Sequence, residues 1–189
     1  MKTNKNQQAK KAKQMCVFAN YACAVFMLLI MCLYFVDFVS VTVNGQAYNN
    51  TNGFSLAFIL FGEIPNSNAL SLVDGGAIQF ASIMSLLCLV GVVALAGIFI
   101  VRAITKKTIL SRHVILVGAI VIFLFVLQTV AVSGLVNATK ANADPTGCCV
   151  VDGTTYNFIA LITLLVFGAV YYVICEKMHT KYGIGFPEN

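Results

Sequence analysis

The sequence predicts an all-α membrane protein: a bundle of four transmembrane helices with both termini in the cytoplasm and a small extracellular β-hairpin cap. Of its 189 residues, 59% are hydrophobic and 10% are charged, whereas soluble domains carry about 25% charged residues. Four apolar runs are long enough to cross a bilayer, and the basic residues gather on one side of them. This composition excludes a soluble enzyme and a nucleic-acid-binding domain, despite the net charge of +5.

The four helices follow from the length of the apolar runs, because about 20 apolar residues are needed to cross the hydrocarbon core. The runs cover about 15–36, 78–101, 114–136 and 156–175, within a membrane domain of residues 15–176. The first run follows a basic stretch, as the core of a secretory signal does. Its apolar core is longer than the roughly 7–15 residues of a signal peptide, so we expect a retained helix.

The distribution of charge predicts the orientation, since cytoplasmic loops carry the excess of Lys and Arg. Eleven of the twelve basic residues fall in the segments 1–14, 102–113 and 177–189. The sequence predicts two outer loops, 37–77 and 137–155, and together these loops hold five of the seven acidic residues. The exception among the basic residues, Lys140, lies in the second loop. We therefore expect an integral plasma-membrane protein with a basic cytoplasmic tail at each end and a cytoplasmic loop at 102–113.

The first outer loop opens with a hairpin pattern. Apolar and polar residues alternate through 39–48, and the run contains Asn44-Gly45, a dipeptide suited to the tight turn of a two-residue hairpin. In the second loop, Asp152-Gly153 lies between two short runs rich in β-branched residues. We expect two hairpins that pair into one small sheet, and a short capped helix at 66–76.

Between the first hairpin and the second helix lies a mostly apolar segment, 54–63, which is too short to span a bilayer. One interpretation is a strand or interfacial helix that packs on the bundle. The other is an exposed apolar patch that binds a partner, because large exposed apolar patches mark interaction sites. On the second interpretation Phe54, Phe58 and Phe61 are the candidate partner contacts.

Seven cysteines are an odd number, and only Cys148 and Cys149 fall in an outer loop. Adjacent cysteines close only a strained ring, so this pair is a candidate redox switch or a bond to another chain. The sequence contains no Cys-x-x-Cys. We therefore favour a structural or free thiol pair, and a membrane thiol-redox protein is an alternative rather than the leading hypothesis.

The predicted spans hold no Asp, Glu, Lys, Arg or His near their centres and no proline. A proton-coupled transporter would need such a titrating group, and without proline a broken-helix binding site has no sequence marker. Neither a His cluster nor a phosphate-binding or nucleophile motif occurs. We expect no enzyme activity, catalytic residue, cofactor or metal.

Two interior amides, Asn20 and Gln128, have two interpretations. Side-chain amides in a membrane bundle hydrogen-bond between helices, and this is the interpretation we favour. In a small oligomeric channel or transporter they would instead line the pore. Small residues at helical spacing (Gly91, Ala94 and Gly97 in the second helix, with Gly118 and Gly168 in the next two) predict close helix contacts.

The arrangement of four helices with a longer, β-bearing first outer loop resembles that of claudins. The tryptophans and cysteine pair of the claudin first loop are missing here, so no family residue is carried over. The leading hypothesis is a non-enzymatic multi-pass protein, an accessory or interaction subunit that presents its outer cap to a membrane or surface protein. A channel or transporter is the first alternative. The expected partners are the lipid bilayer and one of two kinds of protein: another membrane or surface protein, or further copies of the chain. We expect no nucleic-acid partner.

Overall fold

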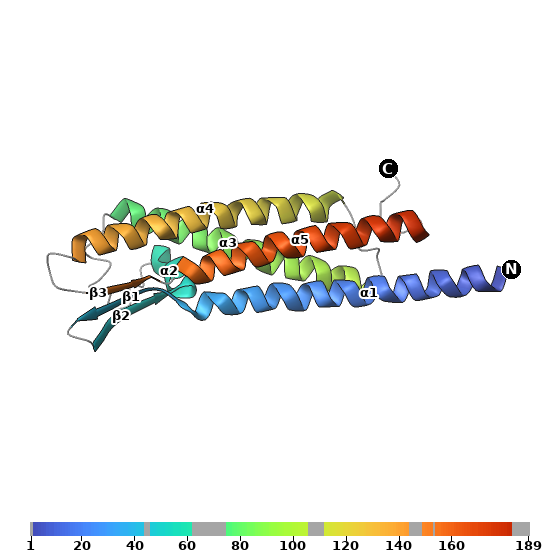
Figure 1. Ribbon diagram of the computed structural model, residues 1–189, viewed down its shortest axis with the longest axis horizontal. Coiled ribbons are helices and arrows are strands. Elements are labelled where there is room, and N and C mark those ends of the chain that lie inside the picture. The colour runs from blue at the N-terminus through green and yellow to red at the C-terminus, as the bar shows by residue number, and fades with distance from the viewer. Residues whose placement is uncertain are drawn as a thin grey trace.

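Four long helices lie side by side and make up most of the molecule (Figure 1). The computed structural model describes residues 2–43, 46–61, 75–105, 112–143, 149–152 and 154–182. The long helices are α1 (Lys2–Cys32), α3 (Gly75–Ile104), α4 (Arg112–Ala143) and α5 (Thr154–Tyr182). A small sheet lies at one end of the bundle, here the sheet end. The start of α1 and the end of α5 lie at the opposite end, here the basic end.

Three helical segments among the described residues are long and apolar enough to cross a membrane: Lys10–Phe35, Gly76–Ile104 and Val114–Ala141. Helix α5 carries a shorter apolar segment, Phe158–Ile174. Large apolar side chains such as Leu29, Val130 and Ile162 are exposed on the outer faces of these helices. Helices that are apolar on all faces are typical of membrane spans, so the chain has the helices of a membrane protein.

Several helices extend past the predicted apolar runs. Helix α1 begins at Lys2, so the predicted tail 1–14 is largely part of the first helix. Its first turns contain Lys, Gln and Ala and no Gly or Pro, a composition that allows the helix to continue in water. Helix α4 continues past residue 136 to Ala143 and reaches the sheet end. Hydropathy marks where a helix leaves the bilayer, not where the helix ends.

The sheet has three antiparallel strands in the order β2-β1-β3. Strands β1 (Asp37–Val43) and β2 (Gln46–Asn52) flank Asn44-Gly45, and Val43 pairs with Gln46. The predicted first hairpin is therefore confirmed. Strand β3 (Cys149–Asp152) pairs with the other edge of β1, with Val41 opposite Val150.

The predicted second hairpin is wrong. Asp152 ends β3, and α5 begins at Thr154, so Asp152-Gly153 connects a strand to a helix rather than two strands. The run after Gly153 begins the long apolar helix α5, whose residues Ala160 and Leu164 are buried in the main core. The two predicted outer loops still share one sheet, because β3 pairs with β1. The predicted helix at 66–76 lies outside the described residues except for Gly75 and Gly76, which begin α3.

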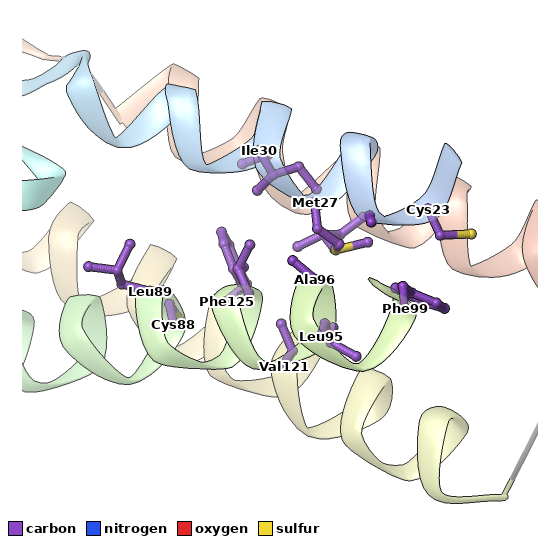
Figure 2. Close-up of a cluster of buried hydrophobic side chains, with 14 of the residues drawn as sticks. Cys23, Met27, Ile30, Cys88, Leu89, Leu95, Ala96, Phe99, Val121 and Phe125 are labelled. Atoms are coloured by element: carbon purple, nitrogen blue, oxygen red, sulfur yellow. The ribbon is translucent and has the colours of Figure 1, made fainter. Parts of the chain in front are cut away.

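The main core lies where α3 packs against α1 on one side and α4 on the other (Figure 2), and Ala160 and Leu164 of α5 also belong to it. Figure 2 shows Met27 of α1 reaching toward Leu95 and Ala96 of α3. At Gly91 of α3, an added Cβ would lie 2.9 Å from Val121 Cγ2 of α4, so the two helices approach closely there, as the small-residue pattern predicts.

A second buried cluster lies at the sheet end. It joins strand β1, the short helix α2 (Gly53–Phe58) and the ends of α3 and α4. Its buried members are Phe38, Leu56, Ala81, Ala131, Val132, Leu135 and Val136. This cluster holds the cap on the bundle and so positions the candidate site.

Candidate functional site

The candidate site is the short helix α2, which begins where strand β2 ends. Asn52, the last residue of β2, caps the helix, because its side-chain Oδ1 accepts a hydrogen bond from the Ser55 amide at 2.8 Å. Such a cap satisfies one of the amide groups left unpaired at a helix start. Leu56 and Ala57 are fully buried. The helix is therefore anchored at its first turn and along its inner face.

Gly53 allows α2 to lie directly against the first helix. A Cβ added at this position would lie 2.6 Å from Tyr34 Cδ1 and 2.9 Å from Phe38 Cζ. Tyr34 belongs to η1 (Leu33–Phe35), the 3-10 turn that continues α1, and Phe38 belongs to β1. Only a residue without a side chain fits this contact unless those rings move.

The three predicted partner contacts do not form one surface. The Phe54 ring lies 4.5 Å from the Phe35 ring and 6.0 Å from the Tyr34 ring, measured between centroids, and it packs on the main core. Phe58 and Phe61, by contrast, are 47% and 69% exposed, with their centroids 6.0 Å apart. Phe61 ends η2 (Ile59–Phe61), the 3-10 turn that follows α2. We call Phe58 and Phe61 the aromatic patch.

Each interpretation of segment 54–63 is therefore correct for some of its side chains. Phe54, Leu56 and Ala57 pack on the bundle, and the aromatic patch faces outward. The sequence pattern could not separate them, because a six-residue helix followed by a 3-10 turn is too short to show a clear apolar face. Residues 62–74 of this loop lie outside the part that the structure describes.

A buried polar cluster connects three helices below the cap. The Tyr34 hydroxyl donates to Gln128 Oε1 at 2.9 Å, and Gln128 Nε2 donates to Ser85 Oγ at 3.1 Å. All three side chains are buried. Gln128 therefore joins α1, α3 and α4 through both ends of its amide and acts here as an interhelical bond. We call these three side chains the Gln128 cluster.

The sequence analysis identified Gln128 and missed Tyr34. Tyr34 stands near the end of an apolar run, where it is typical of the membrane interface. A tyrosine that is buried needs a hydrogen-bond partner for its hydroxyl, and the large interior amide of Gln128 was the available signal. The pattern of one chain did not show that the two residues lie at the same depth.

Asn20, the second predicted pore-lining residue, lies far from Gln128. It is fully buried in α1, and its Nδ2 donates to the Cys16 carbonyl at 3.0 Å. It precedes Tyr34, the partner of Gln128, by fourteen residues, which is roughly 20 Å along a helix. The two amides thus lie at separate levels of the bundle. A pore lined by them stays a prediction about an oligomer.

The thiol hypothesis falls mostly outside the described residues. Cys148 is not among them, and Cys149 is known here only as the first residue of β3, where it pairs with Thr42. Cys16, Cys23 and Cys88 are buried in the helices. Within the described part of the chain, no group of three or more His, Cys, Asp or Glu residues is placed to hold a metal ion.

Comparisons with protein-family models, with curated proteins and with solved structures find no match to the chain. The class that the fold defines is a helical membrane protein with a small β-containing cap. Its function is therefore inferred from the site alone.

Proposed function

We propose that this chain is a non-enzymatic, four-span plasma-membrane protein that binds another membrane or surface protein through the aromatic patch. The observation that carries the proposal is the contrast within α2. Leu56 and Ala57 are fully buried. Phe58 and Phe61 follow Ala57 by one and four residues, and about half or more of each side chain is exposed. Exposed aromatic rings on a rigid, anchored element are typical anchors of protein interfaces.

The proposed topology has α5 as the fourth span and the basic end in the cytoplasm. Four helix termini lie together at that end: the start of α1, the end of α3, the start of α4 and the end of α5. These four segments carry nine of the twelve Lys and Arg residues of the chain, so the positive-inside rule favours this orientation. The cap and its aromatic patch are then outside.

The level of the aromatic patch favours a partner that is itself at the membrane surface. Helix α2 packs against the first turns of α3 through Ala77, Ile78 and Ala81, and the apolar segment of α3 begins at Gly76. The patch is therefore close to the bilayer boundary. A membrane protein, or a surface protein held near the lipid, can reach it.

The test is affinity purification of the tagged full-length chain from native membranes in mild detergent, with quantitative mass spectrometry of whatever is retained. We expect one stoichiometric membrane or surface protein with the wild type. The double variant Phe58→Ala/Phe61→Ala should lower its recovery by about tenfold or more, since interface anchors each contribute about 1–2 kcal/mol or more.

The matched control is Phe18→Ala/Phe123→Ala, which removes two other exposed phenylalanine rings, one each from α1 and α4. This control should retain the partner at the wild-type level. Recovery of the wild-type chain alone would refute the proposal. So would equal recovery of the partner with both double variants, because the aromatic patch would then serve only to anchor the cap in lipid.

A further inference from the structure

An apolar cavity of about 270 Å³ lies between α4 and α5 in the half of the bundle near the basic end. Its inner wall is formed by Met27 of α1 and by Leu95 and Phe99 of α3, which are labelled in Figure 2. Among its other lining residues, Ile115 of α4 and Tyr172 of α5 are 41% and 52% exposed. The cavity therefore opens on the outer surface of the bundle.

Two glycines keep this space open. No atom lies within 4 Å of a Cβ added at Gly118, and the nearest atom at Gly168 is Ile122 Cδ1 at 3.7 Å. The sequence pattern predicts close helix contacts at both positions. Gly168 does lie within contact of α4, whereas Gly118 meets open space, and both glycines line the cavity. An apolar cavity of this size does not hold water. On a membrane helix, its natural filling is a hydrocarbon chain.

The length of the cavity suits one leaflet. Its lining on α4 extends from Val114 to Ile122, about 12 Å along the helix. Half of the hydrocarbon core of a bilayer is about 15 Å thick. A single acyl chain that enters from the basic end would thus lie along the cavity within its own leaflet.

An arginine continues the cavity-lining face of α3 toward the basic end. Arg102 lies seven residues after Leu95 and three after Phe99 on this helix. Residues three or seven apart share one face of a helix. Positive charge at the mouth of an apolar cavity between membrane helices matches an acyl chain joined to an anionic headgroup.

We propose that this cavity binds one acyl chain of an anionic phospholipid, with the headgroup phosphate at Arg102. Arginine binds phosphate through two parallel N–H groups, so Arg102 selects the headgroup and the cavity holds the chain. The proposal requires only that the helices span a membrane. It is independent of the aromatic patch and of which side of the membrane the basic end faces.

The test is native mass spectrometry of the purified full-length chain titrated with palmitoyl-oleoyl phosphatidylglycerol, or with phosphatidylcholine that has the same chains. The wild type should bind one phosphatidylglycerol about tenfold more tightly than phosphatidylcholine. Gly118→Leu fills the cavity and should weaken phosphatidylglycerol binding about tenfold. Arg102→Gln should remove most of the preference for phosphatidylglycerol.

The matched control is Gly134→Leu, which adds the same side chain on α4 at a position with no atom within 4 Å and outside the cavity lining. It should bind phosphatidylglycerol as the wild type does. If circular dichroism shows that Gly118→Leu is unfolded, Gly168→Leu fills the cavity from α5 and replaces it.

Three results would overturn the proposal. The first is equal phosphatidylglycerol binding by the cavity-filling and control variants. The second is equal binding of the two lipids, or no bound lipid, with the wild type. The third is a dimer that Gly118→Leu alone abolishes, since a second copy of the chain would then be the occupant.

Discussion

The side chain of Gln128 connects three helical segments inside the bundle. Its amide accepts from Tyr34 and donates to Ser85, so three helices meet at one residue. In an apolar interior, an unpaired amide or hydroxyl is costly, and the satisfied cluster fixes the depth at which α1, α3 and α4 meet. Interhelical hydrogen bonds in membrane proteins contribute about 0.6 kcal/mol each on average.

Replacing Gln128 should destabilise the bundle. Gln128→Leu removes both hydrogen bonds and leaves the Tyr34 and Ser85 hydroxyls without these partners, so we expect a loss of about 1–2 kcal/mol in the free energy of unfolding. Gln79→Leu is the matched control, because Gln79 is exposed on α3 and its replacement should have little effect. Denaturation in mixed detergent micelles, followed by circular dichroism, measures both.

A double-mutant cycle separates this cluster from simple packing. If Tyr34→Phe and Gln128→Leu act through their shared hydrogen bond, their combined effect should be smaller than the sum of the single effects. Additive losses, or a Gln128→Leu protein as stable as Gln79→Leu, would contradict the assigned role.

At the scale of elements, α2 depends on the close contact between its first residue and the first helix. The added Cβ of Gly53→Ala would press on the rings of Tyr34 and Phe38, and overpacking of this kind costs about 1–3 kcal/mol. Tyr34 also belongs to the Gln128 cluster. Displacing its ring would therefore disturb the cap and the bundle together.

We expect Gly53→Ala to lower the thermal midpoint in detergent and to increase the cleavage of the cap by protease. Gly97→Ala is the control, because no atom lies within 4 Å of a Cβ added there. Alanine is also the better helix former, by about 1 kcal/mol, so Gly97→Ala should be neutral or stabilising. A Gly53→Ala protein with a wild-type midpoint would show that the rings move without cost.

The elements that the sequence predicts well are those with a strong local signal. Asn44-Gly45 between alternating runs predicts the β1-β2 hairpin because the turn chemistry is local. Asp152-Gly153 carries a similar signal, yet the structure has one strand and then α5. There the long apolar helix and the available edge of β1 decide the outcome, and both depend on contacts distant in the sequence.

At the scale of the whole molecule, apolar length predicts the helices but not their neighbours. Small residues at Gly91 and at Gly118 give the same local pattern, yet Gly91 contacts Val121 and Gly118 borders a cavity. The difference lies in the facing helix, which the pattern of one helix does not contain. For the same reason, the sequence identifies Gln128 as a polar interior residue but not its hydrogen bond with Tyr34. It also identifies three candidate phenylalanines, but it does not show that Phe54 is packed while Phe58 and Phe61 are exposed.

The charge distribution over the whole molecule leads to a prediction about orientation. Lys140 is the only basic residue of the sequence outside the segments 1–14, 102–113 and 177–189, and it lies near the sheet end of α4. With the basic end in the cytoplasm, a membrane-impermeant amine reagent applied to intact cells should label the chain at Lys140 alone. Permeabilised cells should show labelling at the lysines of the two tails as well.

The substitution Lys140→Arg keeps the charge and removes the reactive amine, so it should abolish labelling in intact cells while leaving the labelling of permeabilised cells otherwise unchanged. Because a single lysine reports the sheet end and several report the basic end, the two orientations predict opposite patterns. Labelling of the tail lysines in intact cells, with Lys140 reached only after permeabilisation, would place the basic end outside. The aromatic patch would then face the cytoplasm, and a partner would have to be sought there.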